Sequence, residues 1–144
     1  MNEINFIPRG SNILVTSHLV KKNTNLFVGN TAPEIKEIQQ VVAVGPDVIG
    51  LKPGDWIVLD TSLFVQHVKT KSSIKAGIGG ADMITEQVVV PFFSLAWSDE
   101  IYIKINSREI QGTIVDYDSL SDEAKVYITL KEFTKSQEEM KKLN

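Results

Sequence analysis

Three consecutive large apolar residues, Leu26, Phe27 and Val28, lie in the middle of a segment that is otherwise polar or turn-forming. The segment, residues 21–36, reads KKNTNLFVGNTAPEIK, and its asparagines, threonines, Gly29 and proline favour turns over a helix or a strand. We therefore expect a solvated, mobile loop in which the three side chains have no local core. Each can contribute about 1.5–3 kcal/mol when it becomes buried. The chemistry that this pattern predicts is noncovalent anchoring in the groove of another protein.

The alternative is that the triplet forms a short strand packed within its own domain. The flanking segments favour the loop, because the segments on both sides of it are predicted to be strands. Residues 12–20 are short and rich in β-branched side chains, which predicts a strand. Residues 40–48 and 51–59 predict two further strands joined by tight turns. Within this second part, Pro53 and Gly54 suit the two central positions of a type II turn.

The order of these parts resembles the co-chaperonin family, the GroES-like lids of chaperonin cages. The apolar triplet with its glycine precedes VVAVGPDV and KPGDWIVL, and residues 101–110, IYIKINSREI, are similar to the family's closing strands. The resemblance covers residues 7–60 and 100–115. Only residues 49–52 separate the GPDV turn from Pro53, which leaves no room for the long roof hairpin of bacterial members. This shortening is similar to the co-chaperonins encoded by some large bacteriophages.

The resemblance implies a mainly β fold, a GroES-like antiparallel β-barrel with a mobile loop and a short C-terminal helix. It implies that Leu26, Phe27, Val28 and Gly29 bind a GroEL-like chaperonin ring. The protein would then be a homo-oligomer, a sevenfold ring (heptamer) in which each chain's first strand pairs with its neighbour's last. Its function would be that of a co-chaperonin, a lid on the chaperonin cage that assists nucleotide-dependent protein folding.

The strand pattern also predicts where the barrel core lies. We expect residues 13–20, 40–44, 56–59 and 101–105 to form it, with alternate side chains pointing inward. We expect residues 46–53 to form a compact connection and not a projecting hairpin.

Two other functional classes remain open. A virion structural protein could keep the same barrel and use its loops to contact a capsid or tail lattice, because a fold alone does not determine function. A small enzyme is the third class, but no serine lies in a G-x-S-x-G motif, and His18 and His67 lie within strand-like runs. Zinc alcohol dehydrogenases contain a GroES-like barrel as well, yet they need a nucleotide domain and metal ligands. We expect no catalytic residues, no cofactor and no metal.

Composition is compatible with this interpretation. The chain has 144 residues, a net charge of −3 and no cysteine, which predicts one domain without disulfides. Within that domain, residues 61–99 form an insertion and residues 116–144 a C-terminal extension relative to the family. The mixed charges predict no binding of nucleic acid. Neither a signal peptide in residues 1–10 nor a membrane span is expected, so we predict a cytoplasmic protein, in the host cytoplasm if it is phage-encoded.

The insertion should be mostly strand. Residues 64–70 and 84–90 have strand-like patterns. Between them, residues 77–81 (GIGGA) predict a flexible loop rather than a phosphate site, because a strand and not a helix follows. The apolar residues 92–97 (FFSLAW) predict a core or subunit contact, and a partner-binding or cavity-lining role is the alternative.

The extension should contain one hairpin and one helix. Residues 110–117 and 124–130 are expected to pair as a hairpin. Residues 134–143 are expected to form a surface helix, capped by Thr134 or Ser136, with glutamates early and lysines late.

Overall fold

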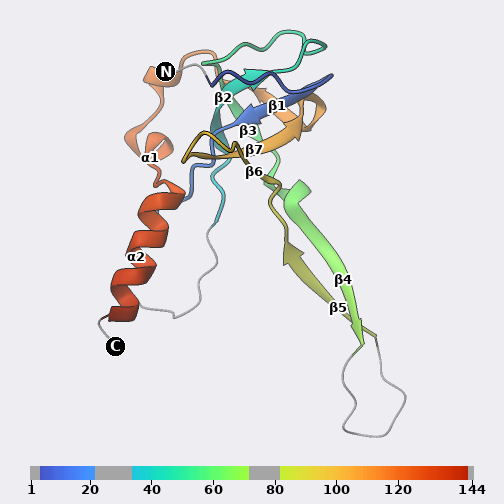
Figure 1. The fold of residues 1–144 in the computed structure, drawn as a ribbon, viewed down its shortest axis with the longest axis vertical. Helices are drawn as coiled ribbons and strands as arrows, with labels where there is room; N and C mark the ends of the chain where they lie inside the picture. The colour runs from blue at the N-terminus through green and yellow to red at the C-terminus, as the bar shows by residue number, and fades with distance from the viewer. Residues whose placement is uncertain (1–3, 22–33, 72–81, 143–144) are drawn as a thin grey trace, which may run out of the picture.

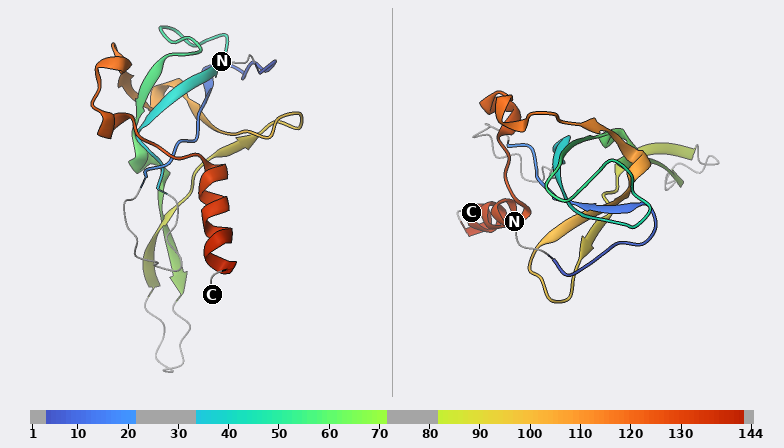
Figure 2. Two further views of the ribbon diagram at one scale, coloured as in Figure 1. Left: turned by 90° about the vertical axis from the view of Figure 1, so that its left-hand side faces the viewer. Right: turned by 90° about the horizontal axis from the view of Figure 1, so that it is seen from above.

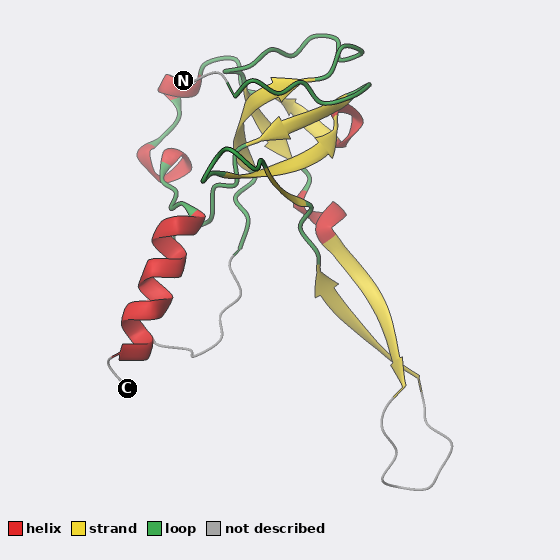
Figure 3. Ribbon diagram, viewed as in Figure 1, coloured by secondary structure: helices red, strands yellow, loops and turns green. Residues whose placement is uncertain are grey.

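The structure is a computed structural model, and it describes residues 4–21, 34–71 and 82–142. The fold is mainly β. Six strands form an antiparallel sheet in the order β6-β7-β1-β2-β3-β8, and β4 and β5 form a separate two-stranded antiparallel hairpin (Figure 1). The strands are β1 (Asn12–Val15), β2 (Ile38–Val44), β3 (Trp56–Leu59), β4 (Val65–Lys71), β5 (Asp82–Val88), β6 (Phe92–Ser94), β7 (Ile101–Asn106) and β8 (Ile110–Thr113). The α-helices are α1 (Asp122–Lys125) and α2 (Leu130–Lys142) (Figure 3). Three short 3₁₀ turns cover Thr61–Phe64, Ser107–Glu109 and Tyr117–Ser119.

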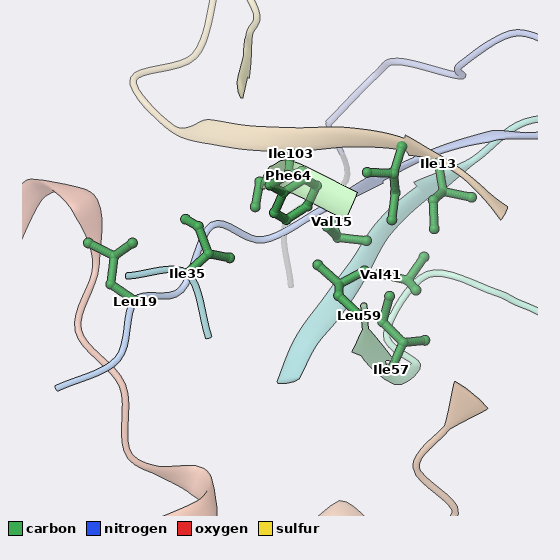
Figure 4. Close-up of a cluster of buried hydrophobic side chains, with 10 residues drawn as sticks. Ile13, Val15, Leu19, Ile35, Val41, Ile57, Leu59, Phe64 and Ile103 are labelled. Atoms are coloured by element: carbon green, nitrogen blue, oxygen red, sulfur yellow. The ribbon is translucent and has the colours of Figure 1, made fainter. Parts of the chain in front are cut away.

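The strand β1 lies at the centre of the large sheet, between β2 and β7. Ile13 is opposite Val44 on one side and Ile105 on the other. Side chains alternate as the sequence predicts, because Ile13 and Val15 point into the main core while Leu14 points to the other face. The main core consists of ten buried residues, most of them from the central strands (Figure 4): Ile13, Val15, Leu19, Ile35, Val41, Ile57, Leu59, Phe64, Ile103 and Ile105.

A second, smaller cluster covers the opposite face of the sheet. It contains Leu14, Val42, Ala43, Leu95 and Tyr102. Partly buried side chains from the N-terminal segment pack on it, and the rings of Phe6 and Phe93 lie 5.3 Å apart. Burial on both faces explains why β1 is apolar at three successive positions and does not show a polar outer face.

The four segments expected in the barrel core are adjacent strands of this sheet, and none of them is a helix. The first is shorter than expected, because β1 ends at Val15 and not at Val20. Strands β6 and β8 end the strand order, and no pairing between them closes the sheet within the described residues. The sheet curls around its core (Figure 2), and the strands that the structure describes do not form a closed barrel.

The connection from β2 to β3 contains turns and no strand, so the prediction of a compact connection is confirmed. The Asp55 amide donates to the Lys52 carbonyl oxygen at 3.1 Å, and Gly54 has a φ of +98°. This is the arrangement expected for a type II turn with Pro53 and Gly54 at its centre.

The insertion contains a hairpin, and its two strands lie close to the two segments, residues 64–70 and 84–90, that the sequence predicts to be strands. Strands β4 and β5 pair from Val65 opposite Val88 to Lys71 opposite Asp82, and the hairpin extends away from the large sheet (Figure 1). A strand follows the glycine-rich residues 77–81, which themselves lie outside the described residues. The helix that a phosphate-binding loop requires is therefore not present after them.

The hairpin expected in the C-terminal extension is wrong. Residues 110–113 form β8, which pairs with β3 instead, and Asp122–Lys125 is a helix. Ser121 caps that helix by accepting a bond from the Ala124 amide, which explains why the segment turns and does not extend.

The C-terminal helix is confirmed, but α2 begins four residues before the expected start. Thr129 caps it, since its Oγ1 accepts a bond from the Glu132 amide at 3.2 Å, so neither Thr134 nor Ser136 does so. The earlier start lets Leu130 and Phe133 pack against the main core. Within the part of the chain that the structure describes, no helix is long and apolar enough to cross a membrane.

Candidate partner-binding site

The predicted binding residues Leu26, Phe27, Val28 and Gly29 all lie outside the described residues. What the structure describes is the base from which their segment leaves and to which it returns. That base consists of residues 16–20, after β1, and residues 34–38, before and at the start of β2.

The two chain ends lie side by side. Leu19 and Ile35 form an isolated antiparallel bridge, and both side chains are buried in the main core. The Val20 amide donates to the Glu34 carbonyl oxygen at 2.8 Å, and the Lys36 amide donates to the His18 carbonyl oxygen at 3.0 Å. The two chain ends that flank residues 22–33 are therefore held together at one place beside the sheet.

The side chain of Gln39 joins these two ends from within the protein. It is fully buried, and its Oε1 accepts bonds from Thr16 Oγ1 and from the His18 amide, both at 2.8 Å. Its Nε2 donates to the carbonyl oxygens of His18 at 2.9 Å and Lys36 at 2.8 Å. All four hydrogen bonds that an amide side chain can readily form are made, so its burial carries no unsatisfied polar atom.

The C-terminal extension holds the same two ends from outside. Leu19 and Ile128 exchange two backbone hydrogen bonds, one of 2.9 Å from the Leu19 amide and one of 3.1 Å from the Ile128 amide. The Lys36 ammonium group donates to the carbonyl oxygen of Val126. One chain segment therefore contacts both sides of the base.

Four aromatic side chains strengthen this contact. The ring of His18 stacks on Tyr127 with centroids 3.6 Å apart, and Trp56 stacks on Tyr117 with centroids 3.7 Å apart. His18 and Trp56 are 6.1 Å apart and connect the two stacks. Both tyrosines belong to the extension, whereas both of their partners belong to the sheet and its loop base.

His18 is neutral in this environment. Burial, with a further contribution from the Lys36 ammonium group, lowers the pKa of His18 from 6.5 to about 4. Burial also lowers the pKa of Lys36. Among the described residues, the buried Nδ1 atom of His18 has no hydrogen-bond partner, which is consistent with a ring held by stacking and not by polar contacts.

A cavity of about 380 Å³ lies between α2 and the sheet, and Ser17, His18 and Asp99 are among the residues that line it. These residue types occur in hydrolase triads, but their contacts differ. Ser17 Oγ donates to the Ile101 carbonyl oxygen at 2.6 Å, and the described residues include no hydrogen bond from His18 to Ser17 or Asp99. Among the described residues, these contacts do not pair Ser17 with a base, as activation of a serine nucleophile requires.

Among the residues that the structure describes, no three His, Cys, Asp or Glu side chains form a group that could hold a metal ion.

The apolar residues 92–97 are divided in their contacts. Leu95 is buried and Phe93 packs against the smaller cluster, while Phe92 and Trp97 are exposed.

Sequence reasoning missed the residues that build the base of the loop. Gln39 is one of two adjacent glutamines, and nothing in their types shows which one is buried. Its position offers a signal, since Gln39 lies two residues before the apolar Val41 and therefore on the same face of the strand, which is buried. The pairing of His18 with Tyr127 joins positions far apart in the chain, and a single sequence carries no signal for it.

No protein-family model, curated protein or solved structure matches this chain.

Proposed function

We propose that this protein is a co-chaperonin of the GroES-like type, a ring-shaped lid that binds a GroEL-like chaperonin through a mobile loop containing Leu26, Phe27 and Val28. Its fold would be a variant of the GroES-like barrel with an added hairpin and a C-terminal helix. The ring would be a homo-oligomer, with seven copies as the family expectation.

The observation that supports this proposal most strongly is the paired base of the loop. The segment that contains the apolar triplet leaves the sheet at Leu19 and returns at Ile35, and these two residues form a backbone bridge. A segment held in this way can extend toward a partner without disturbing the sheet. The strand order around it, with β1 before the segment and β2 and β3 after it, agrees with the order on which the resemblance rests.

Binding energetics also fit a ring of such loops. Ordering a flexible loop costs on the order of 1 kcal/mol per residue, which offsets much of the free energy gained from three buried side chains. One loop should therefore bind weakly. Several loops on one ring bind by avidity, and they can dissociate together when the partner changes shape.

The direct test is the substitution Phe27→Ser. We expect it to abolish nucleotide-dependent binding to a chaperonin ring, because a loss of about 1–2 kcal/mol per loop is repeated in every subunit. The free energy of unfolding should change by less than about 0.5 kcal/mol, since no core contact is lost. Gly29→Val should weaken binding through the backbone conformation that a glycine permits.

The matched control is Ile49→Ser, which removes another apolar side chain from a connection between strands. Ile49 is 94% exposed, so this variant should bind the chaperonin as the wild type does. If Phe27→Ser lowers the melting temperature substantially, the triplet belongs to the core. If Phe27→Ser is stable and binds normally, this loop is not the anchor.

The alternative is a phage virion component that uses the same fold to contact a capsid or tail lattice. The β4–β5 hairpin favours it, because a two-stranded hairpin that extends from the body gains stability when it packs on a partner (Figure 2). The same binding assay separates the two functions, because a virion component joins virion proteins and ignores a chaperonin.

A further inference from the structure

We propose that the C-terminal extension is a conformational latch. In this proposal, residues 117–130, which we call the latch, hold together the two chain ends that flank residues 22–33. The latch and these ends open and close as one unit, while the six-stranded sheet stays folded.

The contacts of the latch are concentrated at the base of the loop. Its last part exchanges two backbone hydrogen bonds with Leu19, receives one from the Lys36 side chain at Val126, and stacks Tyr127 on His18. Leu19 and His18 belong to the chain end that leaves β1, whereas Lys36 belongs to the end that enters β2. The latch therefore contacts both ends within three of its own residues, 126–128.

The rest of the latch is only lightly attached to the body. The 3₁₀ turn Tyr117–Ser119 and helix α1 contain no buried residue, and the stack of Tyr117 on Trp56 is the ring contact made by this part. Segments with few buried apolar contacts open at lower free-energy cost than the strands of a core. Opening of the latch thus requires loss of two ring stacks, a few hydrogen bonds and the packing of Ile128 and Leu130 on the main core, but none of the strand pairs of the large sheet.

Gln39 determines what remains when the latch opens. Its side chain still bonds the backbone of His18 and Lys36 from inside the protein. Because the ends open together with the latch in this proposal, the backbone bonds of Val20 to Glu34 and of Lys36 to His18 would also be lost. The two ends would then be joined through Gln39, with more freedom at Leu19 and Ile35. The latch is therefore a second, reversible restraint added to a permanent one.

The latch has a consequence for partner binding that rests on the proposed function. Closed ends restrict the directions in which the intervening segment can leave the sheet, so less conformational entropy is lost when a chaperonin orders that segment. Opening the latch should therefore weaken chaperonin binding without removing any contact residue.

The test is amide hydrogen exchange, measured residue by residue by NMR on the full chain, for wild type, Tyr127→Ala and Tyr127→Phe. Loss of one ring stack should raise exchange at the Leu19, Lys36 and Ile128 amides about 3- to 10-fold in Tyr127→Ala. The amides of β1 and β7 should keep their wild-type rates. Tyr127→Phe retains the ring and should behave as the wild type does.

The matched control is Phe93→Ala, which removes a ring contact of the other face of the sheet, that with Phe6. It should leave hydrogen exchange at the Leu19, Lys36 and Ile128 amides unchanged. The proposal is wrong if Tyr127→Ala leaves their exchange unchanged, or if exchange in β1 and β7 rises by the same factor. It is also wrong if Tyr127→Ala unfolds the sheet, because the extension would then be part of the cooperative core.

A second measurement separates this inference from the proposed function. Affinity for a chaperonin ring in the presence of nucleotide should fall about 3- to 10-fold in Tyr127→Ala and stay unchanged in Phe93→Ala. If the wild type does not bind at all, the co-chaperonin function is wrong, and the exchange pattern still decides whether the latch exists. If Tyr127→Ala opens the latch and binds with unchanged affinity, the latch exists but does not control binding.

Discussion

At the scale of single residues, the buried polar side chain of Gln39 organises the region on which the proposed function depends. Three of its four hydrogen bonds, of 2.8–2.9 Å, are to backbone groups of His18 and Lys36. They replace the strand ladder between β1 and β2, whose last backbone bond joins the Thr16 amide to the Gln40 carbonyl oxygen. A fully satisfied polar group in a core specifies one arrangement of the chain, because every alternative leaves a polar atom unpaired.

The substitution Gln39→Ala should lower the free energy of unfolding by about 2–4 kcal/mol, because the His18 amide and the Lys36 carbonyl oxygen lose their partner inside the protein. Chemical denaturation measures this loss. Gln40→Ala is the control, since the neighbouring side chain is less buried and makes one hydrogen bond, to the Gly54 carbonyl oxygen, so it should cost less than about 1 kcal/mol. Equal losses in the two variants would contradict this role of Gln39.

His18 predicts a pH dependence of stability. Its pKa is about 4 in the folded protein and 6.5 in the unfolded chain, so the unfolded chain binds the proton more readily between these values. Stability contributed by neutral His18 is therefore complete above pH 6.5 and is lost as the pH falls toward 4. The loss should be about 1–2 kcal/mol, after allowance for solvent screening of a partly exposed ring.

The measurement is urea denaturation at a series of pH values, compared between wild type and His18→Phe. The variant retains a ring for the stack on Tyr127 but cannot titrate, so its stability should decrease less between pH 6.5 and 4. An NMR titration that gives His18 a pKa close to 6.5 would refute the expected effect.

At the scale of elements, the end of β2 contacts the chain just before β1. A Cβ atom at Gly45 would lie 2.2 Å from the Gly10 carbonyl oxygen and 3.0 Å from that of Asn12, and both are backbone atoms that cannot rotate away. The Gly45 amide donates to the Asn12 carbonyl oxygen at 2.9 Å. Glycine is required here because two backbone segments approach each other closely.

We expect Gly45→Ala to destabilise the protein by about 2–4 kcal/mol, since the β2 end must move away from β1. Gly112→Ala is the matched control, because a Cβ atom there has no neighbour within 4 Å and Gly112 has no positive φ. Thermal denaturation of both variants is sufficient. A melting temperature for Gly45→Ala equal to that of Gly112→Ala would show that the contact is not present in solution.

The elements show what a single sequence can and cannot predict. Alternation and β-branched residues predicted the central strands, because the apolar positions of the sequence pattern are the side chains that these strands bury. The length of β1 was overestimated, because a distant side chain, that of Gln39, takes over the hydrogen bonds beyond Val15. The hairpin expected between residues 110–117 and 124–130 was wrong for a similar reason, since Ile128 pairs with Leu19 and α2 begins at Leu130, neither of which has a local signal.

At the scale of the whole molecule, the candidate binding residues are inferred from the sequence and its resemblance to a family, whereas the base of their segment is described by the structure. Within the described residues, β1 is paired on both sides, by β2 and β7, so it is not free to pair with a neighbour's last strand as the resemblance implies. Strands β6 and β8 are the sheet ends that a head-to-tail ring could use instead. Short turns between β2 and β3 would surround the roof opening of such a ring, which should then be wider than in bacterial lids. The number of subunits in the ring therefore also sets the avidity, because each subunit contributes one loop.

The central claim is tested most directly by the mass of the purified protein in solution, measured by light scattering after size exclusion, alone and mixed with a host chaperonin with and without nucleotide. The account predicts a ring, of about 112 kDa for seven copies of the 16.0 kDa chain, which joins the chaperonin only when nucleotide is present. A monomer that never joins the chaperonin, with or without nucleotide, would contradict it.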